Sequence, residues 1–278
     1  MMPISSKRIH VLATAVLLAA ATSAAAAPVF TINPGKNNGL LSKAGKAFEA
    51  SALNGFSSNR IAHTGQGNQY TSDGYIVFNG FSLNSMPVST ALSRVNLDYG
   101  LYATFHQSFH CDGMLAPGVR CQPTALTLDL YADPDNDNSY TVATLASAAR
   151  VGAKGAQILL ASANAMLAGV AGLDSMGGAF ENVSMSWLLS AAGKEYFAGG
   201  KPFYGIANAA FNNTSQGLQC DAAKCKGARV IAITSETGIL DFQQKVPEPG
   251  GLALLGIGLM GMGLVRRRLS AIADGSSG

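Results

Sequence analysis

Segments in which apolar and polar residues alternate constrain the fold of this chain more than any other feature of its sequence. Residues 125–131 alternate cleanly and place Leu126, Leu128 and Leu130 on one side of an extended chain. Residues 183–187 repeat the same period of two. Such a period puts one face of a strand in the core and the other face in solvent. The sequence therefore predicts half-buried β-strands.

Further short apolar or aromatic runs are separated by residues that favour turns. These runs cover residues 74–78, 99–105, 203–211 and 229–234. Many short strands between turn signals are typical of all-β sandwiches and barrels. We predict an all-β fold, with a single antiparallel β-sandwich or jelly-roll-like domain. Two exceptions are expected: a short helix within residues 188–197, and a helical turn within the Ala-rich residues 145–150.

Residues 1–26 have the order of charged, apolar and small residues that a secretory signal peptide requires. Lys7 and Arg8 precede the apolar stretch 9–21, and small residues follow. The apolar stretch is shorter than the roughly 20 residues of a bilayer-spanning helix. We expect cleavage after Ala26, because a cut one residue later would place Pro28 directly behind the cleaved bond.

Residues 246–270 form a second targeting signal, at the other end of the chain. Pro247, Glu248 and Pro249 are followed by the uncharged residues 250–265, and then by a cluster of three arginines, Arg266, Arg267 and Arg268. A helix over the uncharged segment would be about 24 Å long, which can span a slightly thinned bilayer. The arginines would hold its end in the cytoplasm. We predict a single transmembrane helix that holds the exported passenger, residues 27–245, only transiently.

This three-part order resembles the PEP-CTERM sorting signal of Gram-negative bacteria. The resemblance implies that the chain is processed by an exosortase, a transpeptidase-like enzyme of the membrane, in bacteria that make an exopolysaccharide. The expected destination is the cell surface or the extracellular matrix, after a cut near the Pro-Glu-Pro residues.

The charge of the passenger excludes a role that depends on a basic surface. Residues 27–249 contain 14 Lys and Arg against 15 Asp and Glu, a net charge of −1. Nucleic-acid binding requires a basic face, and none is expected here. A surface rich in Ser, Thr, Asn, Gln and Gly is compatible with a neutral polymer such as a polysaccharide.

Several short strings within the passenger resemble the flocculation-associated PEP-CTERM family. They are Tyr-Ala-Asp-Pro-Asp at 131–135, Ala-Gly-Lys-Glu-Tyr-Phe at 192–197, Pro-Phe-Tyr at 202–204 and Phe-Asn-Asn-Thr-Ser-Gln-Gly at 211–217. The resemblance implies a protein that keeps secreted exopolysaccharide around cells, so that the cells aggregate into flocs or biofilm. It offers no catalytic residues, and it does not account for Cys111, Cys121 or the loop between them.

Four cysteines lie in two close pairs, Cys111 with Cys121 and Cys220 with Cys225. An even number of cysteines in an exported chain favours disulfides. We expect the two local pairs, and the other two pairings remain alternatives. The spacings do not fit the knuckles of a zinc module.

Asp133, Asp135 and Asp137 form the most polar cluster of the chain, and their alternation matches the first half of an EF-hand loop. The glycine and the bidentate glutamate of that motif are missing. Calcium is therefore a weak candidate beside a plain solvated turn, and no other cofactor is expected. His106 and His110 share one face of a strand, but two ligands do not make a zinc site.

No local motif for nucleophilic or phosphate chemistry is present. We therefore predict a non-catalytic surface protein. The rival hypothesis is a secreted carbohydrate-active hydrolase, because glycosidases need two carboxylates that only the fold brings together. Asp98, Glu181 and Glu236 are the strand carboxylates considered for that role. A third hypothesis is an adhesin that associates with itself.

Overall fold

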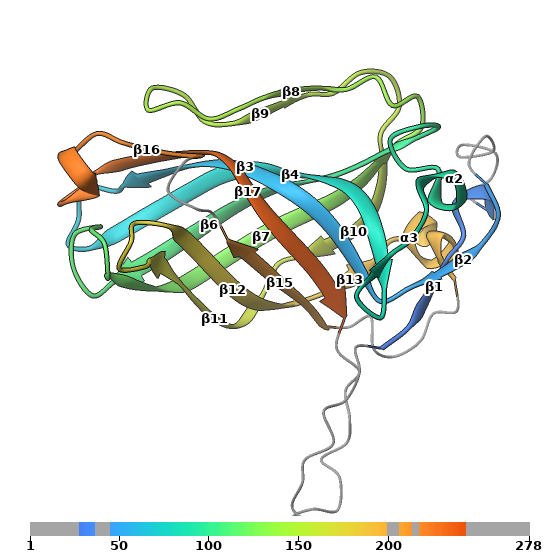
Figure 1. Ribbon diagram of the computed structural model, residues 1–278, viewed down its shortest axis with the longest axis horizontal. Helices are drawn as coiled ribbons and strands as arrows, with labels where there is room; N and C mark the ends of the chain where they lie inside the picture. Colours follow the sequence, from blue (N-terminus) through green and yellow to red (C-terminus); the bar gives the residue numbers. More distant parts are fainter. Residues whose placement is uncertain (1–27, 37–44, 199–205, 213–216, 243–278) are drawn as a thin grey trace, which may run out of the picture.

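Eight antiparallel strands form a sheet that closes on itself into a barrel (Figure 1). In order around the barrel they are β11 (Met166–Leu173), β12 (Ala179–Ser186), β15 (Ile206–Asn212), β17 (Val230–Phe242), β3 (Ala52–His63), β4 (Gln69–Leu83), β6 (Gly100–Cys111) and β7 (Arg120–Asp133). The ring closes where β11 pairs with β7, through Ala171 opposite Cys121 and Gly172 opposite Arg120.

The computed structural model describes residues 28–36, 45–198, 206–212 and 217–242. The predicted signal peptide, the Pro-Glu-Pro residues, the membrane helix and the arginine cluster lie outside these ranges. Within them, no helix has both the length and the apolar character that a membrane crossing requires.

The all-β, antiparallel prediction is confirmed, and the strands close into a barrel instead of forming the two facing sheets of a sandwich. The physical reason is strand length. β3, β4, β6 and β7 are 12 to 15 residues long, and long strands that twist and tilt bring the first and last members of a meander together.

Smaller elements extend or cover the barrel. β10 (Ile158–Ala163) and β13 (Leu188–Leu189) continue the sheet beyond β7, while β5 (Met86–Pro87) pairs with β4 and β16 (Leu218–Cys220) with β17. The remaining elements are η1 (Pro34–Lys36), α2 (Thr90–Ser93), α3 (Ala191–Tyr196), η4 (Ala223–Cys225) and the strands β1 (Phe30–Ile32), β2 (Phe48–Ala50), β8 (Ser139–Thr141), β9 (Arg150–Gly152) and β14 (Phe197–Ala198).

The predicted short helix is present as α3, and the helical turn predicted at residues 145–150 is not. Ser190 caps α3, since its Oγ accepts a hydrogen bond from the Gly193 N–H at 2.9 Å. Residues 145–149 instead form the irregular tip between β8 and β9, where the Thr144 hydroxyl accepts backbone N–H groups. That local side-chain bond competes with a helix.

The two ends of the barrel are closed differently. At one end the small sheet β14–β1–β2 packs aromatic rings against the end of β17, with Phe30 5.1 Å and Phe197 5.5 Å from Phe242 between ring centroids. We call this the aromatic end. The opposite end, where β16 lies (Figure 1), carries both disulfides, and we call it the disulfide end.

Candidate functional site

A layer of polar side chains crosses the interior of the barrel between the two ends. It comes from β3, β4, β6, β12 and β17 and consists of Ser57, Asn59, Ser72, Gln107, Glu181 and Glu236. Alternation along each strand turns these side chains inward. We call this set the polar layer.

Apolar side chains fill the barrel on both sides of the polar layer. Toward the aromatic end the neighbours along the strands are residues such as Ile76 and Val183. Toward the disulfide end they are residues such as Phe109 and Ile233. The glutamates are therefore enclosed by apolar groups above and below.

Glu236 is held by hydrogen bonds from one neighbouring strand. Its Oε2 accepts from Ser57 Oγ at 2.8 Å and from Asn59 Nδ2 at 3.3 Å. Ser72 Oγ in turn donates to Asn59 Oδ1 at 3.2 Å. The pKa of Glu236 is raised to about 8, chiefly by burial; the hydrogen bond from Ser57 and the weaker one from Asn59 oppose this rise, and the charge of Glu181 adds to it.

Glu181 faces the same interior from β12. Its Oε1 accepts a short hydrogen bond from Gln107 Nε2. Burial raises the pKa of Glu181 to about 7, against the effect of that bond. The side chain keeps some accessible surface only because it borders interior cavities.

Both glutamates line two small cavities, one on each side of the polar layer. The cavity toward the disulfide end has a volume of about 30 Å³, and the cavity toward the aromatic end about 20 Å³. Such volumes hold one or two water molecules, whereas sites for organic ligands take about 300–1,000 Å³. The pair can hold and share a proton, but these cavities have no room for a sugar ring.

The sequence singled out both glutamates but not the groups that hold them. Ser57, Asn59, Ser72 and Gln107 were missed because polar residues in an alternating pattern are normally assigned to the solvent face. No local signal in the sequence distinguishes a polar residue that faces a barrel interior. Asp98, the third carboxylate considered, lies away from this layer and pairs with Arg94 at 2.8 Å.

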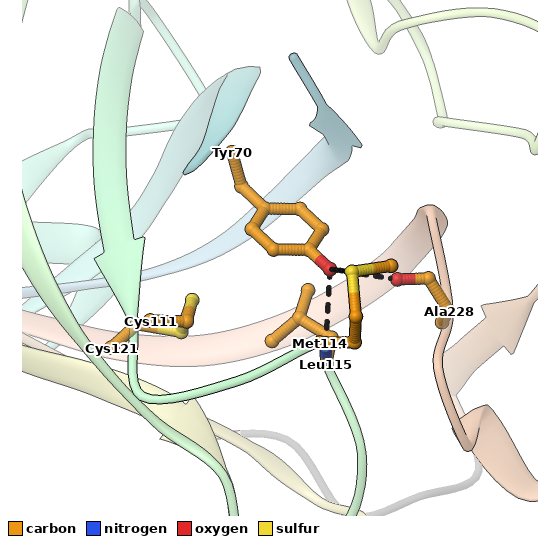
Figure 2. Close-up of a disulfide and its surroundings, with 6 residues drawn as sticks. All are labelled: Tyr70, Cys111, Met114, Leu115, Cys121 and Ala228. Atoms are coloured by element: carbon orange, nitrogen blue, oxygen red, sulfur yellow. Dashed lines mark hydrogen bonds between the residues drawn. A yellow bond between two sulfur atoms is a disulfide. The ribbon is translucent and has the colours of Figure 1, made fainter. Parts of the chain in front are cut away.

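The disulfide end is closed by two loops that meet over the barrel. The loop between β6 and β7 contains Leu115, and the segment between β16 and β17 contains Ala228, whose N–H donates to the Leu115 carbonyl at 3.0 Å. The Tyr70 side chain of β4 points toward both loops, with its hydroxyl between Leu115 and Ala228 (Figure 2). Its hydroxyl accepts from the Leu115 N–H at 3.1 Å and donates to the Ala228 carbonyl at 3.0 Å.

Each of these two loops carries one disulfide. Cys111 is bonded to Cys121 across the β6–β7 pair, and Cys220 at the end of β16 is bonded to Cys225 at the end of η4. These are the local pairings that the spacing predicts. Both bonds lie beside the Tyr70 contacts, so they brace the loops that cover the larger cavity.

The acidic loop after β7 is organised by its first aspartate. The buried Asp133 carboxylate accepts four backbone N–H groups, from residues 135 to 138, at 3.1–3.3 Å. Asp135 and Asp137 point to solvent. The described residues hold no group of three or more His, Cys, Asp or Glu side chains suited to a metal ion. Calcium binding by this loop stays a prediction.

The two histidines of β6 share one face of the strand, as their spacing predicts, and this is the outer face of the barrel. His106 pairs with Asp73 of β4, with 2.7 Å between Nδ1 and Oδ1, and both side chains are about half exposed. His110 is exposed further along the strand.

Comparison with known proteins identifies the tail of the chain. Residues 245–268 match the family model of the PEP-CTERM protein-sorting motif. Neither the curated proteins nor the solved structures contain a match to this chain. The matched segment contains the predicted Pro-Glu-Pro residues, uncharged span and arginine cluster, and it marks the chain as an exosortase-sorted extracellular protein.

Proposed function

We propose that this protein acts without catalysis at the cell surface or in the extracellular matrix, where it associates with exopolysaccharide and promotes flocculation or biofilm formation. The observation that carries the proposal is the sorting motif at residues 245–268, which begins three residues after the last barrel strand ends at Phe242. A compact module with such a tail is suited to delivery and retention outside the cell.

Two further observations support the proposed binding role. The passenger carries almost no net charge, which favours neutral partners over ionic ones. Its interior is filled by side chains, with cavities of only about 20 and 30 Å³. The contact with a polymer would then have to be made by the outer surface.

Deletion of the gene in the native host tests this function. Loss of flocs, together with polysaccharide that moves from the cells into the medium, is the expected result. Return of the gene should restore both properties. Unchanged flocs with normal retention of polysaccharide on the cells would remove the proposed role.

The second candidate is a hydrolase that trims the same polymer, and the convergence of Glu181 and Glu236 favours it. A glycosidase uses two carboxyl groups, one of which stays protonated as the general acid because its pKa is raised, and here the pKa values of both glutamates are raised. Release of reducing sugar by the exported protein, and its loss in Glu181→Gln and Glu236→Gln, would decide for this function. The proposed binding role predicts no sugar release from any of the three proteins.

A further inference from the structure

Part of the barrel's outer wall is covered by described residues, and another part is open. The β8–β9 arm lies over β3 and β4 (Figure 1), where Tyr140 packs 5.3 Å from Tyr75 between ring centroids. No described element lies over the outer faces of β12, β15 and the second half of β17. The open part therefore presents side chains directly to solvent.

Two adjoining hollows run across this open wall. One has a volume of about 430 Å³ and extends over β11, β12, β15 and β17. The other, of about 490 Å³, extends over β12, β15, β17, β3 and β4. They share Asn182, Ala210 and Ile239. Together they form one shallow groove, which we call the amide groove.

The sheet register explains the shape of the amide groove. Val170, Asn182, Ala210, Ile239 and Asn54 lie opposite one another on five successive strands. With about 4.8 Å between strands, this row is roughly 19 Å long. Because the Ala210 side chain is small, the surface is hollowed in the middle of this row. A groove of this length can accommodate several rings of a polymer chain.

The rows on either side provide hydrogen-bonding groups and an aromatic surface. In one row, Ser184 Oγ donates to Asn208 Oδ1 at 2.7 Å, and Asn208 Nδ2 donates to Asp241 Oδ1 at 2.9 Å. In the other row, Phe56 is 42% exposed. Ile239 between them is 47% exposed. Exposed apolar side chains beside polar groups are typical of sites that bind rings with both apolar faces and hydroxyls.

Several amides of the groove are not engaged by the rest of the described structure. The side chains of Asn54, Asn79 and Asn182 make no hydrogen bond to another described residue, in contrast to the buried Asn59. Each free amide offers two donors and one acceptor oxygen. Among the described residues that line the two hollows, Asp241 is the only charged one, and its carboxylate already accepts a hydrogen bond from Asn208. This chemistry complements a neutral, hydroxyl-rich ligand.

We infer that the amide groove is a binding site for a neutral polysaccharide. The inference rests on the proposed function and assigns that function to one face of the barrel. The sugar hydroxyls would exchange hydrogen bonds with the free amides, and the apolar faces of the rings would lie against Phe56 and Ile239.

Affinity electrophoresis of the exported protein in gels that contain polysaccharide tests the site. The probes are the host's own exopolysaccharide, the neutral glucan dextran and the polyanion alginate. Ala210→Glu places a long charged side chain in the middle of the groove. Ala125→Glu makes the same change at an exposed alanine of β7, outside the groove, and is the matched control. Asn182→Asp keeps the size of the side chain but removes its donors.

We expect the native protein to be retarded by the host polysaccharide and by dextran. Ala210→Glu should bind about tenfold more weakly, Asn182→Asp should also bind more weakly, and Ala125→Glu should be unchanged. All three exposed substitutions should leave the melting temperature close to that of the native protein.

The other outcomes separate the site from the function. Retardation of all variants to the same extent as the native protein would show that the amide groove is not the binding site, and it would leave the proposed function unchanged. No retardation of the native protein by the host polysaccharide would overturn both. Stronger binding to alginate than to dextran would overturn the inference that the ligand is neutral. Concentration-dependent self-association that Ala210→Glu abolishes would instead make the groove an interface between copies of the chain.

Discussion

At the scale of single residues, Glu181 and Glu236 face an interior without a compensating cation. In the part of the chain that the structure describes, no Lys, Arg or His lines either of the two cavities that they border. Burial penalises the charged form of a carboxyl group, and two such groups also repel each other. The folded protein therefore retains protons that the unfolded chain releases.

This proton retention predicts that stability decreases as pH rises. The pKa of an unfolded glutamate is about 4.5, and in the fold it is about 7 for Glu181 and about 8 for Glu236. Between these values the folded state binds more protons, so the free energy of unfolding falls by about 1.4 kcal/mol per pH unit and per proton. The stabilising effect is complete below pH 4.5 and is lost as pH passes 8.

Thermal unfolding of the native protein and of Glu236→Gln between pH 4.5 and 9 measures this effect. Glutamine keeps an oxygen that can accept from Ser57 and Asn59 but has no proton to lose. The variant should lose less stability over this interval, and its advantage over the native protein should grow with pH. Parallel curves would show that Glu236 does not hold the extra proton.

Tyr70 is the second residue at which a substitution has a predictable effect on stability, through the loss of its hydroxyl group. In Tyr70→Phe the Leu115 N–H and the Ala228 carbonyl lose their bonds to this hydroxyl in a buried place. An unsatisfied buried group costs about 1–3 kcal/mol. Chemical unfolding should show a loss of that size, with faster proteolysis of the loop between β6 and β7.

Tyr102→Phe is the matched control for this substitution. Tyr102 is only 3% exposed, and its hydroxyl makes no hydrogen bond to another described residue. Its removal should change stability by well under 1 kcal/mol. Equal losses of stability in the two variants would argue against a role of the Tyr70 hydrogen bonds in stabilising the disulfide end.

At the scale of elements, α3 depends on a close approach to β10. A side chain at Gly193 would meet the carbonyl group of Leu160, although the backbone of this glycine is helical. Alanine is the better helix former, so any loss of stability in Gly193→Ala must come from crowding.

Gly193→Ala should therefore destabilise the protein by about 1–3 kcal/mol or more, as measured by chemical unfolding. Gly80→Ala is the control, because a side chain at this glycine of β4 would meet no atom within 4 Å. A change of a few tenths of a kcal/mol is expected there. A neutral result for Gly193→Ala would mean that α3 moves away from β10 without cost.

The comparison of predicted and observed strands shows what alternation can reveal. Residues 125–131 were predicted because Leu126, Leu128 and Leu130 alternate with polar residues, and they lie within β7. Residues 74–78 form only the middle of β4, which is 15 residues long. The part of β4 before this run was missed because Ser72 also faces inward, where the pattern expects an apolar side chain. The barrel is therefore harder to predict than its strands.

At the scale of the whole molecule, both termini of the described barrel lie at the aromatic end. Asp241, Ala52, Ser82 and Pro87 are opposite one another across β17, β3, β4 and β5. The chain therefore leaves the barrel toward the sorting motif at the end that the β14–β1–β2 sheet closes. The disulfide end lies at the far side of the barrel from that exit (Figure 1).

This arrangement predicts that sorting can remove the tail without removing any part of the barrel. The last strand ends at Phe242, and the expected cut is near Pro247–Pro249, so every barrel strand remains in the product.

Protein recovered from the cell surface should end near these residues when its C-terminus is determined by mass spectrometry. A chain truncated after Lys245 should melt at the same temperature as the full-length chain, because all the strand pairings of the described barrel lie within residues 52–242. Replacement of Pro247 and Pro249 by alanine should leave uncut protein in the membrane fraction, while the matched control Pro87→Ala, on the exposed strand β5, should be processed normally. Surface protein that still contains Arg266, Arg267 and Arg268 would contradict the cut, and a truncated chain of lower stability would show that the tail contributes to the fold.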